Sequence, residues 1–122
     1  RVNMAKLDMD GPFDLSNKVI DSQVSADLIG NYALGYMNKK GKFVVKVVGR
    51  ADADLRSELK AAHKQYRPGF LSRIFGGKPL DKFKFSFANT VEAAYQVECR
   101  VFEAFGGTNK LKNQAEPAPP AG

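Results

Sequence analysis

The sequence predicts an α+β fold class: a small three-stranded antiparallel sheet flanked by helices. Two segments with alternating apolar residues, 42–48 and 82–87, predict strands. Two segments with apolar residues at helical spacing, 55–66 and 89–106, predict helices, and a further apolar segment, 29–37, predicts another strand. The resulting order of strand, strand, helix, strand, helix is typical of domains in which helices pack on an antiparallel sheet.

The composition indicates a single globular domain. A chain of 122 residues with 43% hydrophobic and 26% charged residues has enough apolar content for one core. No apolar run approaches the roughly 18 residues of a membrane span, so no membrane partner is expected. The single cysteine, Cys99, excludes an internal disulfide and favours a cytoplasmic, reducing location. With one cysteine and one histidine, the chain lacks the ligands of a usual zinc site.

The chain divides into three parts. Residues 1–28 form a weakly patterned extension that Gly11-Pro12 interrupts, residues 29–114 form the domain, and residues 115–122 form a Pro/Ala-rich tail that we expect to be disordered. Within the domain, the turn at 38–41 joins the first two strands into a hairpin. Alternation in the second strand predicts Phe43, Val45 and Val47 on one face of the sheet.

A helix and a third strand follow the hairpin. Asp52 or Asp54 is expected to cap the helix, which places four apolar residues on one face: Leu55, Leu59, Ala62 and Tyr66. Arg67-Pro68-Gly69 ends the helix, and the loop after it contains apolar residues between Phe70 and Phe75. In the strand 82–87 the three phenylalanines point inward and the two lysines outward.

Glu98 stands out in the last helix, which Asn89 and Glu92 are expected to open as a capping box. At about 100° per residue, Glu98 lies only about 20° from Val91 and about 40° from Phe102, in the middle of the apolar face. A carboxylate facing a core is costly unless it is paired or binds a metal. The residues leave two answers open: an ion pair with Arg50 or Arg56, or a hard cation such as Mg²⁺ or Mn²⁺.

The net charge of +6 and the pI near 9.5 favour an anionic partner, and nucleic acid, DNA above all, leads that class. The alternative is a basic surface without a partner. The residues that we expect to contact nucleic acid lie on the strands and the first helix: Lys46, Arg50, His63, Lys82 and Lys84.

The order of several short motifs resembles the GIY-YIG endonuclease domain. Gly30-Asn31-Tyr32 opens the first strand, Val47-Val48-Gly49-Arg50 closes the second, and the helix with Glu98 precedes Leu111-Lys112-Asn113. The resemblance implies a sandwich around a three-stranded sheet and hydrolysis of phosphodiester bonds with one divalent metal, Mg²⁺ or Mn²⁺. It also implies a catalytic set in which Glu98 holds the metal and Tyr32 activates water. Arg50 or Arg56 would support the phosphate, and Asn113 would line the site.

Two positions depart from the pattern of this family. Val47 stands where the second motif has a tyrosine, and Glu58 stands where the first helix has an arginine. The sequence therefore supports two hypotheses: a metal-dependent endonuclease, or a catalytically inactive scaffold that binds DNA, RNA or protein. A protein-binding role would use the apolar loop 70–75. Tyr32 as a strand tyrosine and Asn113 as a turn or cap are structural alternatives for those two residues.

Overall fold

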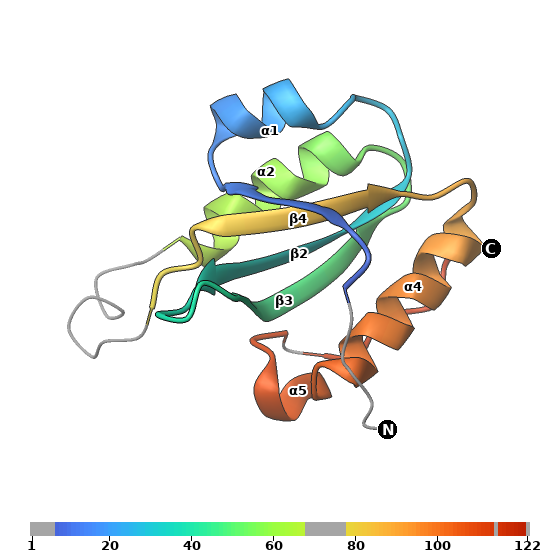
Figure 1. Cartoon of the computed structure of the whole chain (residues 1–122). Helices are drawn as coiled ribbons and strands as arrows, with labels where there is room; N and C mark the ends of the chain where they lie inside the picture. Colours follow the sequence, from blue (N-terminus) through green and yellow to red (C-terminus); the bar gives the residue numbers. More distant parts are fainter. Residues whose placement is uncertain (1–6, 68–77, 114, 122) are drawn as a thin grey trace.

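The computed structural model describes residues 7–67, 78–113 and 115–121, and it shows an α+β fold built on one antiparallel sheet (Figure 1). The expected sheet of three strands is wrong, because an N-terminal segment adds a fourth strand and the sheet order is β1-β4-β2-β3. The strands are β1 (Asp10–Asp14), β2 (Gly30–Met37), β3 (Phe43–Ala51) and β4 (Lys82–Phe87). The described helices are α1 (Asn17–Gln23), α2 (Leu55–Tyr66), α4 (Val91–Ala104) and α5 (Gly107–Lys110).

The extra strand β1 and the helix α1 both lie in residues 1–28, which we expected to be weakly structured, so that expectation is wrong for these two elements. Gly11-Pro12 resembles a chain breaker, yet β1 pairs only with β4 at an edge of the sheet, where a proline without an N–H is tolerated. The register shifts between Asp10 and Phe13, so these two residues lie in an irregular stretch of the strand. The Phe13 ring then packs 5.6 Å from the Phe83 ring, measured between centroids.

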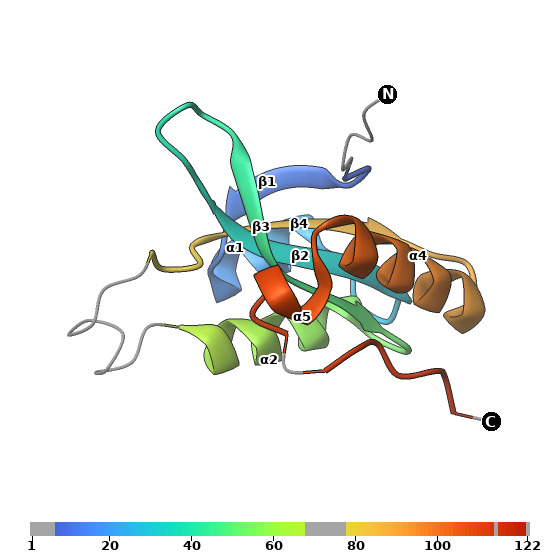
Figure 2. The same cartoon turned by 90° about the horizontal axis from the view of Figure 1, so that it is seen from below.

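Helices cover both faces of the sheet, and each face has its own apolar core (Figures 1 and 2). On one face, α1 and α2 bury a cluster that includes Leu34, Leu59 and Phe83. On the other face, α4 and the segment after it bury a smaller cluster that includes Val48 and Phe102. β3 and β4 each pair antiparallel with β2, so they run parallel to each other on either side of it.

The alternation of β3 is interrupted, which corrects the face that we expected for one valine. Leu34 pairs with Val47 and Gly35 pairs with Val45, so Lys46 is the extra residue of a bulge. Val47 consequently packs in the α2-side core, whereas Val45 packs in the α4-side core instead of sharing the Val47 face. A side chain at position 35 would overlap the carbonyl of Val44, so the bulge requires glycine there.

The caps of the two long helices explain where they begin. Asp54 is the N-cap of α2, as one of the two expected residues. The expected capping box at Asn89 is wrong, because the N-cap of α4 is Thr90, whose hydroxyl accepts a hydrogen bond from the Ala93 N–H at 3.0 Å. The longest described helix has 14 residues, and no helix in the described part of the chain has the length and apolar character needed to cross a membrane.

Candidate functional site around Arg50 and Glu98

Glu98 forms an ion pair with an arginine. Glu98 projects from α4 toward the β3 strand, where Arg50 Nη1 donates a hydrogen bond to Glu98 Oε1 at 2.7 Å. Both side chains are nearly buried, with exposed fractions of 10% for Arg50 and 11% for Glu98. Of the two partners that the sequence left open, the structure therefore selects Arg50.

Arg50 makes further contacts that use its remaining donors. Its Nε donates to Asp52 Oδ1 at 2.7 Å, and its Nη2 donates to Asp52 Oδ2 at 3.4 Å. Its Cζ also lies 5.1 Å from the centroid of the Tyr95 ring, within the range of a cation–π contact. Two carboxylates and an aromatic ring therefore hold the guanidinium in place.

Burial and pairing act in opposite directions on Glu98. Burial raises the pKa of the Glu98 carboxyl, and the hydrogen bond and charge of Arg50 lower it, with a net shift above its ordinary value. The pKa of Arg50 is also raised, first by its hydrogen bond to Asp52. The ion pair thus offsets only part of the cost of placing this carboxylate against the core.

A hollow of about 550 Å³ opens beside this pair, at the free edge of β3. Four carboxylates and a single guanidinium line it, which gives a formal charge of −3. A hollow with this charge repels a phosphate backbone. Its lining residues come from β3, the start of α2, α4 and the C-terminal segment: Arg50, Ala51, Asp52, Ala53, Asp54, Ser57, Glu58, Glu98 and Ala118.

Tyr32 does not share the face of the sheet on which Glu98 lies. Tyr32 is 8% exposed and belongs to the core under α2, whereas its neighbour Asn31 points to the other face and donates to the Ala94 carbonyl of α4 at 2.8 Å. Burial strongly raises the pKa of the Tyr32 phenol, and the Glu58 carboxylate raises it further. A phenol with a raised pKa is poorly suited to activate water.

The tyrosine explains the glycine of the second motif. Tyr32 pairs with Gly49 across β2 and β3, and its ring lies over the Gly49 Cα. A Cβ at position 49 would overlap the Tyr32 ring and hydroxyl. Gly49 is therefore required for packing, whatever the motif does in chemistry.

The donors around Glu98 do not fit a divalent metal. Mg²⁺ and Mn²⁺ prefer several oxygen ligands in octahedral geometry. One oxygen of the Glu98 carboxylate already accepts from Arg50, and a guanidinium at that distance repels a cation. Among the described residues, no group of three acidic, histidine or cysteine side chains is placed to hold a metal ion.

Arg56, the other arginine expected near the phosphate, lies elsewhere. Its Nε donates to the Val24 carbonyl at 2.7 Å, and its Nη2 donates to the Asp21 carbonyl at 3.2 Å. These two carbonyls end α1, so Arg56 satisfies acceptors that a helix terminus leaves free. It joins α2 to α1, and its hydrogen bonds and ion pair go to Val24 and Asp21, not to Glu98.

Asn113 covers the edge of the sheet. Its Oδ1 accepts from the Val48 N–H at 3.0 Å and its Nδ2 donates to the Val48 carbonyl at 2.8 Å. The neighbouring Lys112 N–H donates to the Lys46 carbonyl at 2.6 Å. The segment therefore pairs with β3 as a short strand would, and protects an edge that is otherwise open. The side-chain amide of Asn113 makes its hydrogen bonds with the Val48 backbone and none with Glu98.

The residues expected to contact nucleic acid do not form one surface. Lys46 Nζ donates to the Lys110 carbonyl at the β3 edge at 3.0 Å, while Arg50 is held by Glu98 and Asp52. Lys82 forms an ion pair with Asp14 of β1, and Lys84 lies 5.6 Å from the centroid of the Phe43 ring. His63 lines a separate hollow on α2, on the opposite side of the sheet from α4.

Asn31 also helps to hold α4 on the sheet, a role that was not predicted from the sequence. It is 1% exposed, its Nδ2 donates to the Ala94 carbonyl, and its Oδ1 has no partner in the described part of the chain. It ties α4 to the sheet one turn before Glu98. In the sequence, Asn31 is a polar residue directly before the apolar residues 32–34 of a predicted strand. This pattern could have predicted a buried polar side chain that needs a hydrogen-bond partner.

The apolar loop 70–75, on which a protein-binding role was based, lies outside the described residues. The resemblance to GIY-YIG domains rests on the motifs alone. Comparisons of the chain with protein-family models, with curated proteins and with solved structures gave no match.

Proposed function

We propose that this chain is a non-catalytic nucleic-acid-binding module, built on a scaffold that resembles GIY-YIG domains. The observation that carries the proposal is the Arg50–Glu98 ion pair, because Glu98 is the residue to which the resemblance assigns the metal. We also propose a cytoplasmic location, for which the single free cysteine is the support.

Three features of the site argue against cleavage. The carboxylate that would hold the metal is paired, the phenol that would activate water has a raised pKa, and Asn113 is bonded to the backbone of β3. Phosphodiester hydrolysis needs positive charge at the phosphate in the transition state. The hollow beside Glu98 supplies one guanidinium already held by two carboxylates.

Charge supports the choice of partner. The net charge of +6 favours polyanions, because lysines and arginines release counterions from a phosphate backbone when they bind it. The acidic hollow at the β3 edge leaves this positive charge on other surfaces, which include the exposed Lys39 and Lys40 in the β2–β3 turn. Binding without cleavage is therefore the activity most consistent with the charge distribution.

Fluorescence anisotropy with a labelled duplex, repeated at several salt concentrations, tests the proposal. We expect the logarithm of the affinity to fall linearly with the logarithm of the salt concentration, with a slope of about −1.8 or steeper, as two or more phosphate contacts require. A labelled duplex RNA measured in parallel ranks the two nucleic acids. Absence of binding at low salt, or binding that salt does not weaken, would refute the proposal.

A further inference from the structure

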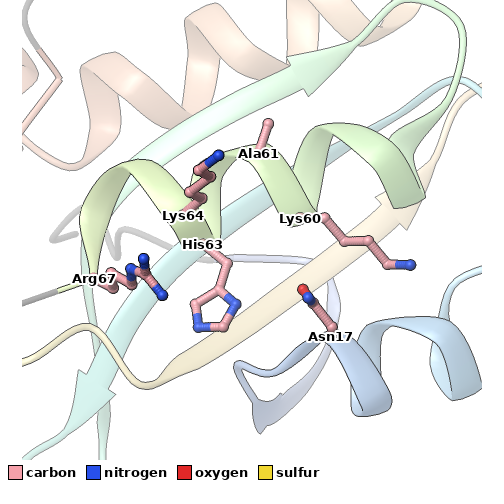
Figure 3. A pocket seen from close by; sticks show the side chains of 6 residues that line it. All are labelled: Asn17, Lys60, Ala61, His63, Lys64 and Arg67. Carbon is pink, nitrogen blue, oxygen red and sulfur yellow. The ribbon is translucent and has the colours of Figure 1, made fainter.

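We propose that the hollow around His63 on α2 is a binding pocket for a phosphate group. It has a volume of about 410 Å³ and lies between the second half of α2 and the start of α1. Figure 3 shows His63 on α2 next to Arg67, the C-cap residue of that helix, with Asn17 of α1 on the other side of His63. The lining residues are Asn17, Lys60, Ala61, His63, Lys64 and Arg67.

The basic residues gather there because of helical spacing. Positions 60, 63, 64 and 67 follow the spacing i, i+3, i+4, i+7, which places four side chains within an arc of about 100°. The core face of the same helix carries Leu55, Leu59 and Ala62. The helix thus presents an apolar stripe to the sheet and a basic stripe beside α1.

Five of the six residues that line the pocket carry side-chain donors, and none of the six carries a carboxylate. Lysine and arginine donate charge-assisted hydrogen bonds to phosphate oxygens, and a guanidinium can donate two in parallel. Imidazole and amide groups each add a neutral donor. The basic lining of this hollow contrasts with the acidic lining of the hollow at Glu98.

Stabilisation of the helix end does not account for all of this charge. A helix C-terminus carries about half a negative charge, and basic residues in the last turn compensate it. Lys60 is balanced by Asp21, whose Oδ1 lies 2.5 Å from Lys60 Nζ. Lys64 and Arg67 remain exposed, and their two positive charges exceed what the helix end requires.

The phosphate can be free in solution or belong to a nucleic acid. The second source rests on the proposed function, because it requires that the chain binds nucleic acid at all. Binding of free phosphate does not require nucleic-acid binding, so the phosphate pocket and the proposed function can fail separately.

The test compares two double variants that change the charge equally. K64E/R67E reverses the two exposed charges of the pocket, and K39E/K40E reverses two exposed charges in the β2–β3 turn. If K64E/R67E does not fold, the milder K64Q/R67Q replaces it, with K39Q/K40Q as its control. Amide chemical shifts are followed by NMR while inorganic phosphate, or chloride at equal ionic strength, is added.

We expect phosphate to cause saturable shifts at Asn17 and residues 60–67 that chloride does not cause. The pocket variant should weaken phosphate binding at least about tenfold, and the turn variant should leave it within about twofold. No saturable shift at these amides, or equal weakening by both variants, would overturn the proposal.

Anisotropy with labelled DNA then separates the two sources. Greater loss of DNA affinity in K64E/R67E than in K39E/K40E supports the pocket as a contact for the DNA backbone. A phosphate site in a protein that does not bind DNA supports a site for free phosphate, and it refutes the proposed function alone. DNA binding that both variants weaken equally, with no shift from phosphate, refutes the pocket and leaves the proposed function intact.

Discussion

Arg50 and Glu98 connect the edge strand of the sheet to the helix that covers one of its faces, through a hydrogen bond of 2.7 Å between two nearly buried side chains. The same guanidinium is held from its other side by Asp52. A carboxylate that looks like a metal ligand in the sequence is, in the fold, half of an ion pair. The predictions below test this pair and its surroundings.

The first prediction concerns the energy of the pair. Arg50→Met and Glu98→Leu should each lower the free energy of unfolding by about 1–2 kcal/mol. Arg50→Met leaves the nearly buried Glu98 carboxylate unpaired, and Glu98→Leu leaves the Arg50 guanidinium with Asp52 alone. The double variant should cost less than the sum of the two, since it removes both charges. Urea unfolding of the four proteins gives the coupling energy.

The Lys82–Asp14 ion pair between β4 and β1 is the matched control, because both of its side chains are more exposed. Its double-variant cycle should give a smaller coupling energy. A coupling energy for Arg50 and Glu98 no larger than that of the control would show that the buried pair does not hold α4 on the sheet.

The second prediction concerns pH. The pKa of Glu98 is raised in the folded state, first by burial, so the folded protein keeps a proton that the unfolded chain has already lost. The stability of the wild type relative to Glu98→Gln should therefore be greatest below about pH 4.3, the ordinary glutamate pKa, and should fall as pH rises above it. Urea unfolding at a series of pH values measures this difference.

Arg50 lowers the pKa of Glu98, so its removal should extend the pH range over which this loss occurs. The Arg50→Met protein, measured with and without Glu98→Gln, checks this extension. A wild-type difference that rises with pH in the same range would mean that pairing, not burial, dominates the pKa of Glu98.

The third prediction concerns Gly49. Gly49→Ala should lower the free energy of unfolding by about 1–3 kcal/mol, because the new methyl group overlaps the Tyr32 ring. Adding Tyr32→Leu should recover part of the loss, since it removes the atoms that clash. Suppose instead that Tyr32→Leu lowers the free energy of unfolding by the same amount in the Gly49→Ala protein as in the wild type. That result would show that the Tyr32 ring is not the reason that position 49 requires glycine.

The fourth prediction concerns the edge of the sheet. Asn113→Ala should lower the free energy of unfolding by about 1–2 kcal/mol and speed hydrogen exchange at the Val48 amide, which loses its acceptor. Asn113→Asp keeps an acceptor for that amide and should preserve more of its protection. Equal exchange at Val48 in all three proteins would contradict a role for Asn113 in covering β3.

The helices α2 and α4 and the strands β2, β3 and β4 were predictable because their apolar periodicity is strong. The short helices α1 and α5 were not predicted. Glu98 could also be marked as a residue in need of a partner, since its helical phase depends only on the sequence around it. The choice between Arg50 and Arg56 could not be made, because it depends on how β3, α1 and α4 pack. The strand β1 was missed because Gly11-Pro12 disfavours a central strand, and β1 is an edge strand.

A catalytic site shared by Tyr32 and Glu98 was the expectation that the fold supports least, because the two side chains lie on opposite faces of the sheet. In a strand, adjacent residues point to opposite faces, so the assignment depended on which face α4 covers. The faces of Val45 and Val47 were also predicted wrongly, because the bulge at Lys46 adds one residue and reverses the alternation of β3. The basic stripe at positions 60, 63, 64 and 67 could be predicted from their helical spacing, whereas its position beside α1 depends on how α1 packs on α2.

The most direct test of the central claim is a nicking assay on supercoiled plasmid with Mg²⁺ or Mn²⁺, with wild type and Glu98→Ala side by side. The Arg50–Glu98 ion pair predicts that both proteins leave the plasmid supercoiled at concentrations at which the wild type binds DNA. Nicking by the wild type that disappears in Glu98→Ala would contradict the account and would establish Glu98 as a working metal ligand.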